Sequence, residues 1–246
     1  MQDPGNMRVV GISLVLLLGT VPAMAAAVRL EPDRDATLIE DPEGVLANGA
    51  GPALFAGLTS QGSVRRALLH FDVAAALPER AVIERVVLTL FMAPSNSEIR
   101  TLRLHRVLAD WGEGPSYGEG GGGADAEPGD VTWLHTFYDA EEWVRAGGQL
   151  LGRASAAADV SGSGFYAWGS SPQMEADVRL WAASPALNFG WALLGDETAP
   201  QSSKNFASRE HPNAMLRPAL EITYRAPGDH PYAPSTKGST LRDRLP

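Results

Sequence analysis

The sequence predicts an all-β protein, an antiparallel β-sandwich of jelly-roll type with two short helices. Roughly ten short segments are rich in apolar and β-branched residues, and glycine and proline separate them. A parallel sheet would require strands and helices to alternate regularly, and the sequence lacks this pattern. The expected strands are residues 37–40, 54–57, 66–72, 83–92, 102–108, 132–137, 164–168, 189–194, 205–208 and 219–224.

Alternating apolar and polar side chains support these strands. In residues 66–72, Ala67, Leu69 and Phe71 fall on one face, and polar residues fall on the other. Residues 83–92 are apolar on both faces, which predicts a central strand that is covered on both sides. One core is expected to bury Leu69, Phe71, Leu88, Leu90, Leu104, Trp191, Leu193 and Ile222, with Trp181 beside them.

The first expected helix follows Ser171. A serine suits the N-cap position, and Pro172 suits the first helical position. Met174, Val178 and Trp181 recur at helical spacing, which predicts a buried face on this helix.

The second expected helix lies between Asp139 and Gly147. Asp139 with Glu142 three residues later is typical of a capping box, and glycine is typical of a helix end. Trp143 is expected to pack this helix against the domain.

The start of the sequence carries export signals. Arg8 provides a positive charge, residues 9–20 are uncharged and mostly apolar, and Ala23-Met24-Ala25 matches a cleavage signal. The apolar run is shorter than the roughly 20 residues that span a bilayer, so a membrane anchor is the less favoured alternative. We expect a signal peptide at 1–25, one domain at 26–225, a polar tail or linker at 226–246, and a secreted product with no membrane span after cleavage.

Charge and cysteine content narrow the function classes. The formal net charge is −9, whereas a nucleic-acid partner would need a basic surface. The chain has no cysteine, which excludes a thiolate nucleophile, a disulfide framework and a cysteine-ligated zinc ion. The metalloprotease motif His-Glu-x-x-His does not occur, and we expect no catalytic residues and no enzyme.

Three tryptophans at strand ends are candidates for ligand contact. Trp111, Trp133 and Trp168 lie beside glycine, glutamate or serine, and Glu113 is a polar neighbour. Flat aromatic rings can stack on the apolar faces of sugars, which would make this a carbohydrate site. The alternative is that these tryptophans plug the ends of the sandwich.

Acidic and amide side chains in the first long loop suggest calcium. Asp41, Glu43 and Asn48 lie close together in sequence, and calcium prefers carboxylate and carbonyl oxygens. Ordinary turn chemistry explains the same residues and is favoured over a metal site.

Four stretches together resemble the disaggregatase-related domain family that is named for the letters DNRLRE, which is similar to a carbohydrate-binding module type. The stretches are residues 46–51 with 54–57, residues 65–72 with Leu77-Pro78, residues 104–114, and residues 206–210 with 217–224. The resemblance covers residues from about 35 to 224 and implies a secreted jelly-roll domain, of a kind that in some relatives binds acidic polysaccharides such as alginate. The glycine-rich stretch after Trp111 departs from the family pattern.

The resemblance also singles out individual positions. Arg209 and Glu210 match the Ser-Arg-Glu stretch before the last strand, and Arg66 matches the stretch Arg-x-Leu-Leu-x-Phe-Asp. A structural ion pair is the favoured interpretation of Arg209 and Glu210, and ligand contact is the alternative.

The sequence therefore predicts a non-catalytic extracellular module whose partner is a polysaccharide or cell-surface glycan. A structural or adhesive matrix protein is the second hypothesis. A polysaccharide hydrolase or lyase is the third, because a pair of carboxylates can act on glycosidic bonds without a recognisable motif.

Overall fold

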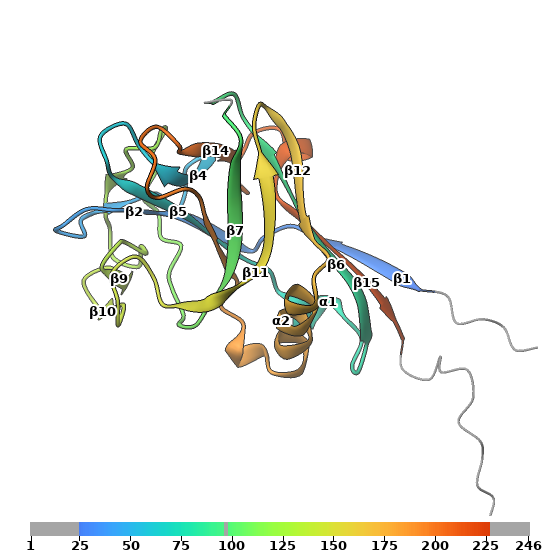
Figure 1. Cartoon of the computed structure of the whole chain (residues 1–246). Coiled ribbons are helices and arrows are strands. Elements are labelled where there is room, and N and C mark those ends of the chain that lie inside the picture. The colour runs from blue at the N-terminus through green and yellow to red at the C-terminus, as the bar shows by residue number, and fades with distance from the viewer. Residues whose placement is uncertain (1–24, 96–97, 227–246) are drawn as a thin grey trace, which may run out of the picture.

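The computed structural model describes residues 25–95 and 98–226, and most of them form two packed antiparallel layers (Figure 1). The first layer contains β1 (Ala26–Leu30), β15 (Ala219–Arg225), β6 (Val82–Met92), β12 (Gly164–Gly169) and β14 (Lys204–Ala207). The second contains β2 (Arg34–Ile39), β5 (Val64–His70), β13 (Trp191–Leu194), β7 (Arg100–Val107) and β11 (Leu150–Val160). The predicted all-β, antiparallel fold class is confirmed, and the jelly-roll type stays a prediction.

One strand joins the two layers. β4 (Ala53–Leu58) pairs with β14 of the first layer and with β5 of the second. Four short strands form two separate ribbons, β3 (Leu46–Ala47) with β8 (Ala124–Asp125), and β9 (His135–Phe137) with β10 (Glu141–Glu142).

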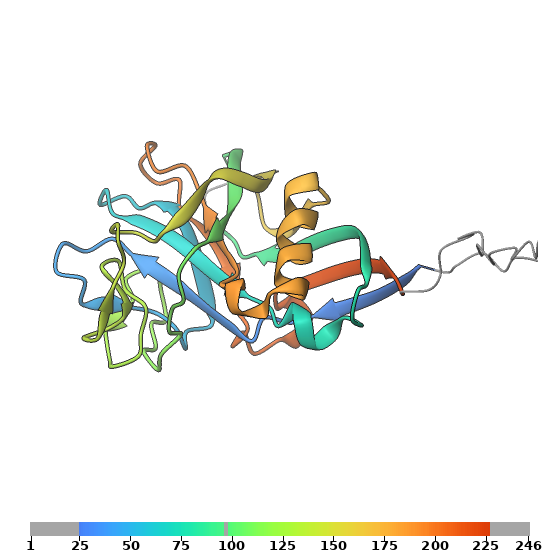
Figure 2. The same cartoon turned by 90° about the horizontal axis from the view of Figure 1, so that it is seen from below.

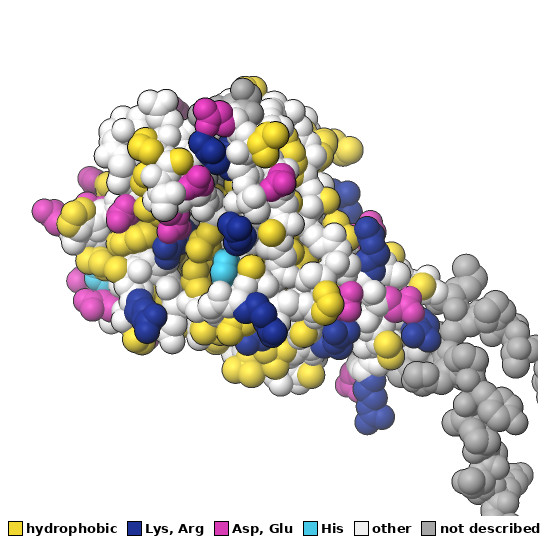
Figure 3. Space-filling view, viewed as in Figure 1, with side chains coloured by type: hydrophobic (Ala, Val, Ile, Leu, Met, Phe, Trp, Pro, Cys, Tyr) yellow, Lys and Arg dark blue, Asp and Glu magenta, His cyan; other side chains and the backbone are white. Residues whose placement is uncertain are grey.

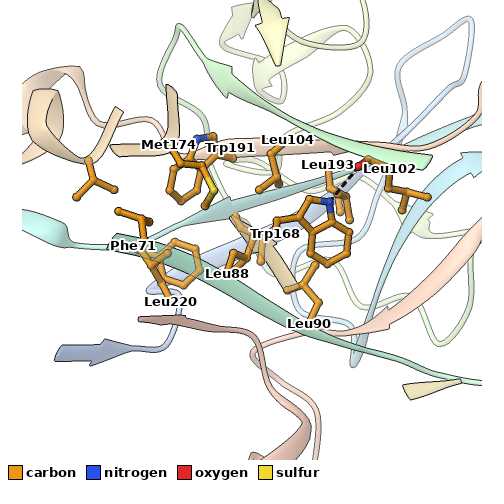
Figure 4. Packing of buried hydrophobic residues seen from close by; sticks show 14 of the residues in the cluster. Phe71, Leu88, Leu90, Leu102, Leu104, Trp168, Met174, Trp191, Leu193 and Leu220 are labelled. Carbon is orange, nitrogen blue, oxygen red and sulfur yellow. Dashed lines mark hydrogen bonds between the residues drawn. The ribbon is translucent and has the colours of Figure 1, made fainter. Parts of the chain in front are cut away.

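The main core lies between the layers. Each of the large apolar residues expected there is fully buried, and Figure 4 shows Leu88, Leu90 and Leu220 of the first layer facing Leu104, Trp191 and Leu193 of the second. A second buried cluster includes Leu38, Leu68, Val107 and Trp111. The predicted core is confirmed.

The helix after Ser171 is confirmed. α2 (Pro172–Ala183) begins at Ser171, whose hydroxyl accepts the N–H of Met174. Its apolar face is buried, and it packs between β6 and β11 at one end of the layers (Figure 1 and Figure 2).

The helix predicted between Asp139 and Gly147 is wrong. Asp139 has a positive φ of 61°, which a helix does not allow, and Glu141–Glu142 pair with β9 as a strand instead. Trp143 is buried as expected, but from extended backbone, and its indole N–H donates to the carbonyl of Thr132.

The other helices are short, and no expectation covered them. They are α1 (Val73–Ala76), which Asp72 caps, and the 3₁₀ turns η1 (Pro185–Leu187) and η2 (Ala214–Leu216). No helix within the described residues is long and apolar enough to cross a membrane. The signal-peptide and tail predictions fall on residues 1–24 and 227–246, which lie outside the described part of the chain.

Candidate functional site: a carboxylate cluster and an uncharged outer groove

Two of the three candidate tryptophans are core residues. Trp111 and Trp168 are both fully buried, so the expectation that they reach solvent is wrong. Trp168 points inward from β12, and its indole N–H donates to the carbonyl of Leu102 across the sandwich, as Figure 4 shows. The indole N–H of Trp111 donates to Phe189, and the Arg34 guanidinium covers the ring at 4.8 Å.

The third tryptophan, Trp133, is half-buried beneath Arg66. The guanidinium carbon of Arg66 lies 4.9 Å from the ring centroid. Arg66 also donates to both carboxylate oxygens of Glu197, at 2.7 and 2.8 Å. Arg66 therefore covers one face of the Trp133 ring.

The structure brings together three other predicted site residues that lie far apart in sequence. Glu113 lies in the loop after β7, and Arg209 and Glu210 follow β14. They meet Asp35 of β2, which sequence reasoning missed. The sequence around Asp35 carries no distinctive local pattern. Its neighbours in the cluster lie far away along the chain, so the sequence could not place them beside it.

We call Asp35, Glu113 and Glu210 the carboxylate cluster. One oxygen from each lies within 4.8 Å of the others. The guanidinium of Arg209 donates to Glu210 at 2.6 Å and to Glu113 at 3.1 and 3.2 Å. The backbone N–H of Arg209 donates to Asp35 Oδ2 at 2.8 Å, and the N–H of Asp35 donates to Glu113 Oε1 at 2.7 Å.

Two glycines allow the loop to present Glu113. A Cβ on Gly112 would lie 1.9 Å from the carbonyl oxygen of Gly129. Gly114 has a positive φ of 71°, and a Cβ there would lie 1.8 Å from Asp130 Oδ1. The glycines on either side of Glu113 therefore let this loop pack closely against residues 129–130.

Burial and like charge act on the cluster together. Burial, followed by the neighbouring Glu210 and Glu113 carboxylates, raises the pKa of Asp35 well above its ordinary value, and the Arg209 N–H opposes this only in part. Burial also raises the pKa of Glu113, against the opposing hydrogen bond from the Asp35 N–H. Negative charge at this site is only partly compensated.

The residues proposed for calcium in the first long loop form backbone hydrogen bonds. Asp41 Oδ2 accepts the N–H of Val45, and Asn48 bonds the N–H of Gly118 and the carbonyl of Ala53. Glu43 is exposed. The Asp41 bond is local, as the turn-forming alternative expects, whereas Asn48 also ties this loop to Gly118, 70 residues further along the chain.

A second feature lies on the outer side of the first layer, where β4, β14 and β6 adjoin. Leu54, Phe206 and Met92 point into the core. Because side chains alternate along a strand, Phe55, Asn205 and Phe91 point outward. Two hollows of about 560 and 270 Å³ open here, and Asn205 lines both.

We call these two hollows the outer groove, whose lining includes Phe55, Phe91, Gln61, Gln201, Asn205, Ser203 and His211. Apart from His211, no described residue of the lining is ionisable. Phe165 of β12 packs edge-on against Phe91, with ring centroids 5.1 Å apart, and is 57% exposed. The groove thus combines aromatic faces with amides and hydroxyls.

A further hollow within the described part of the chain is charged. Arg100, Arg103, Asp196 and Glu197 line a space of about 460 Å³. Arg100 already pairs with Glu98 and Asp196, and Glu197 holds Arg66. Figure 3 shows both signs of charge distributed over the face in view.

Comparison with known proteins adds no family. No protein-family model and no curated protein matches the chain. The resemblance to the DNRLRE family stays a prediction.

Proposed function

We propose that this chain is a non-catalytic extracellular module that binds a neutral polysaccharide in the outer groove. The observation that carries the proposal is the lining of that groove, which places Phe55 beside uncharged amides and hydroxyls in one hollow and Phe91 beside Asn205 in the other. The predicted resemblance to a carbohydrate-binding family agrees with a polysaccharide partner, but it implies an acidic ligand in some relatives rather than a neutral one.

The lining suits the chemistry of a sugar. The apolar face of a pyranose ring stacks on a phenyl ring, and its hydroxyls both donate and accept hydrogen bonds. Gln61, Gln201 and Asn205 each carry a donor and an acceptor in one side chain. Asn205 Oδ1 is a buried atom without a hydrogen-bond partner among the described residues, so it does not itself face the groove.

The charges favour a neutral chain over an acidic one. An acidic polysaccharide needs arginine or lysine beside its carboxylates, and the groove lining contains neither. The net charge of −9 would also repel such a ligand.

The same lining argues for binding without turnover. Hydrolysis of a glycosidic bond requires two carboxyl groups that flank the bond, roughly 5–9.5 Å apart. Among the residues that the structure describes, no carboxylate lines the outer groove. The carboxylate cluster has its side chains tied to Arg209 and to backbone N–H groups.

Affinity electrophoresis tests the proposal. The purified domain should be retarded in gels that contain a neutral polysaccharide, such as a β-glucan, xylan or galactomannan, and should migrate freely in alginate. Phe55→Ala and Asn205→Ala should each weaken retention about tenfold, which corresponds to roughly 1.4 kcal/mol. Leu187→Ala, a half-exposed residue of η1, should leave retention unchanged.

Each contrary result has a definite meaning. If no polysaccharide retards the wild type, the binding proposal fails and the structural or adhesive matrix protein takes its place. Retention by alginate alone contradicts a neutral ligand. Normal retention of Phe55→Ala, with an unchanged Tm, contradicts the assignment to the outer groove.

A further inference from the structure

We propose that the carboxylate cluster binds a divalent cation of the calcium type. This site is separate from the outer groove and does not depend on glycan binding. The first argument is charge. Asp35, Glu113 and Glu210 bring three negative charges together, and the Arg209 guanidinium supplies one positive charge. Arg34 donates to the Asp110 carboxylate and to the Trp111 carbonyl, and its charge also opposes the rise in the pKa of Glu113.

Two carboxylate oxygens of the cluster are buried without a hydrogen-bond partner among the described residues, which is an observation separate from the short distances between the carboxylates. Asp35 is fully buried, yet its Oδ1 has no hydrogen-bond partner among the described residues, and Glu210 Oε2 is also a buried atom without one there. A buried carboxylate oxygen without a partner destabilises the folded state, because it has lost its hydrogen bonds to water and forms none within the protein. A cation bound by both oxygens would replace that lost solvation.

Two other aspartates of this chain provide an internal comparison. Asp177 and Asp130 are also fully buried. Asp177 accepts from Arg106 and Gln173 on one oxygen, and from Ser155 and Trp191 on the other. Both oxygens of Asp130 also have partners, Ser116 and Glu127. Asp35 is therefore the exception among these three.

The ligand type identifies the cation. All three side chains offer carboxylate oxygens, with no imidazole or thiolate among them, which suits a hard cation rather than zinc. When all three carboxyl groups are ionised, the cluster and Arg209 together carry two excess negative charges, which equals the charge of one divalent ion. Calcium accepts irregular oxygen geometry with water completing the shell, whereas magnesium demands a near-ideal octahedron.

Such an ion would link three parts of the chain. Asp35 lies on β2, Glu113 follows β7, and Glu210 follows β14. His211, which lines the outer groove, is the next residue after Glu210. The ion would therefore hold a segment that leads into the groove, and its removal should loosen that segment.

Thermal unfolding with calcium is the test. Bound metal is removed from the wild-type domain with EDTA, and the protein is desalted. Its thermal unfolding is then followed with and without CaCl₂ or MgCl₂. The heat of cation binding is measured in parallel by calorimetric titration. At a hundredfold excess of calcium over its Kd, Tm should rise by about 5–10 °C. Glu210→Gln and Asp35→Asn should lose most of that rise and the binding heat. Glu221→Gln, an exposed glutamate of β15, should retain both.

Three outcomes would overturn the proposal. The first is a wild type whose Tm and binding heat do not respond to millimolar calcium. The second is a full calcium response in folded Glu210→Gln and Asp35→Asn proteins, which places the cation elsewhere. The third is an equal response to magnesium, which contradicts a site of the calcium type. Because Glu210 is only half-buried, its variant serves as the readout if Asp35→Asn does not fold.

Discussion

Asp35 is the residue on which the electrostatics of the carboxylate cluster depend. Its neighbours come from positions 113, 209 and 210, so no local pattern in the sequence could reveal them. Sequence reasoning found Glu113, Arg209 and Glu210 separately, and the resemblance rather than spacing indicated the last two. Their shared contacts with Arg209 fit the structural ion pair that the sequence favoured.

Asp35→Asn should change how stability depends on pH in calcium-free buffer. The pKa of Asp35 is raised above its ordinary value of 3.8, so the folded protein binds this proton more tightly than the unfolded chain does. That contribution to stability is present at low pH and is lost as pH rises from the unfolded pKa through the folded pKa. Asparagine cannot lose a proton. The variant's Tm, relative to wild type, should therefore rise between about pH 4 and pH 7.

The measurement is thermal unfolding of both proteins across this pH range in EDTA. Saturating calcium should reduce the pH effect, because the cation compensates the charge that the proton otherwise removes. A Tm difference that does not vary with pH would mean that Asp35 titrates normally in the folded protein.

At the scale of elements, local sequence patterns predicted some helices and strands correctly and missed others. α2 was predictable because Ser171, Pro172 and the apolar spacing all agree. β11 was missed because Leu150–Val160 is rich in alanine and lacks a strand signal, and it is extended because it pairs with β7. The false helix at 139–147 had a good capping pattern, but pairing with β9 prevailed.

The inward position of Trp168 gives a testable consequence for the two layers. The side chain is fully buried, and its indole N–H ties β12 to the carbonyl of Leu102 on β7. Trp168→Ala should lower the free energy of unfolding by about 3–5 kcal/mol, through a cavity and a lost hydrogen bond. Urea unfolding measures this change.

The matched control is Phe165→Ala on the same strand. Phe165 points outward and is 57% exposed, so its removal should cost much less stability. Equal losses for the two variants would contradict the assignment of inward and outward faces on β12.

At the scale of the whole molecule, the fold class and the core followed from alternation, whereas the binding site did not. Tryptophan content drew attention to the strand ends, but Trp111 and Trp168 fill the interior. The outer groove is lined by phenylalanine and amide side chains that form no recognisable motif in the sequence. Only the pairing of β4 with β14 sets Phe55 opposite Asn205. We therefore propose that the polysaccharide binds to a face of the sheet rather than to the loops.

Side-chain NMR of the phenylalanine rings tests this placement most directly. Short oligosaccharides of a β-glucan, a xylan and a mannan are titrated into protein labelled at its aromatic carbons, with oligoalginate as the acidic control. We predict that one of the neutral ligands shifts the ring signals of Phe55 and Phe91, and leaves those of the buried Trp111 and Trp168 in place. Shifts confined to Trp133, shifts with oligoalginate alone, or unchanged ring signals with every ligand would contradict the claim that the outer groove binds a neutral polysaccharide.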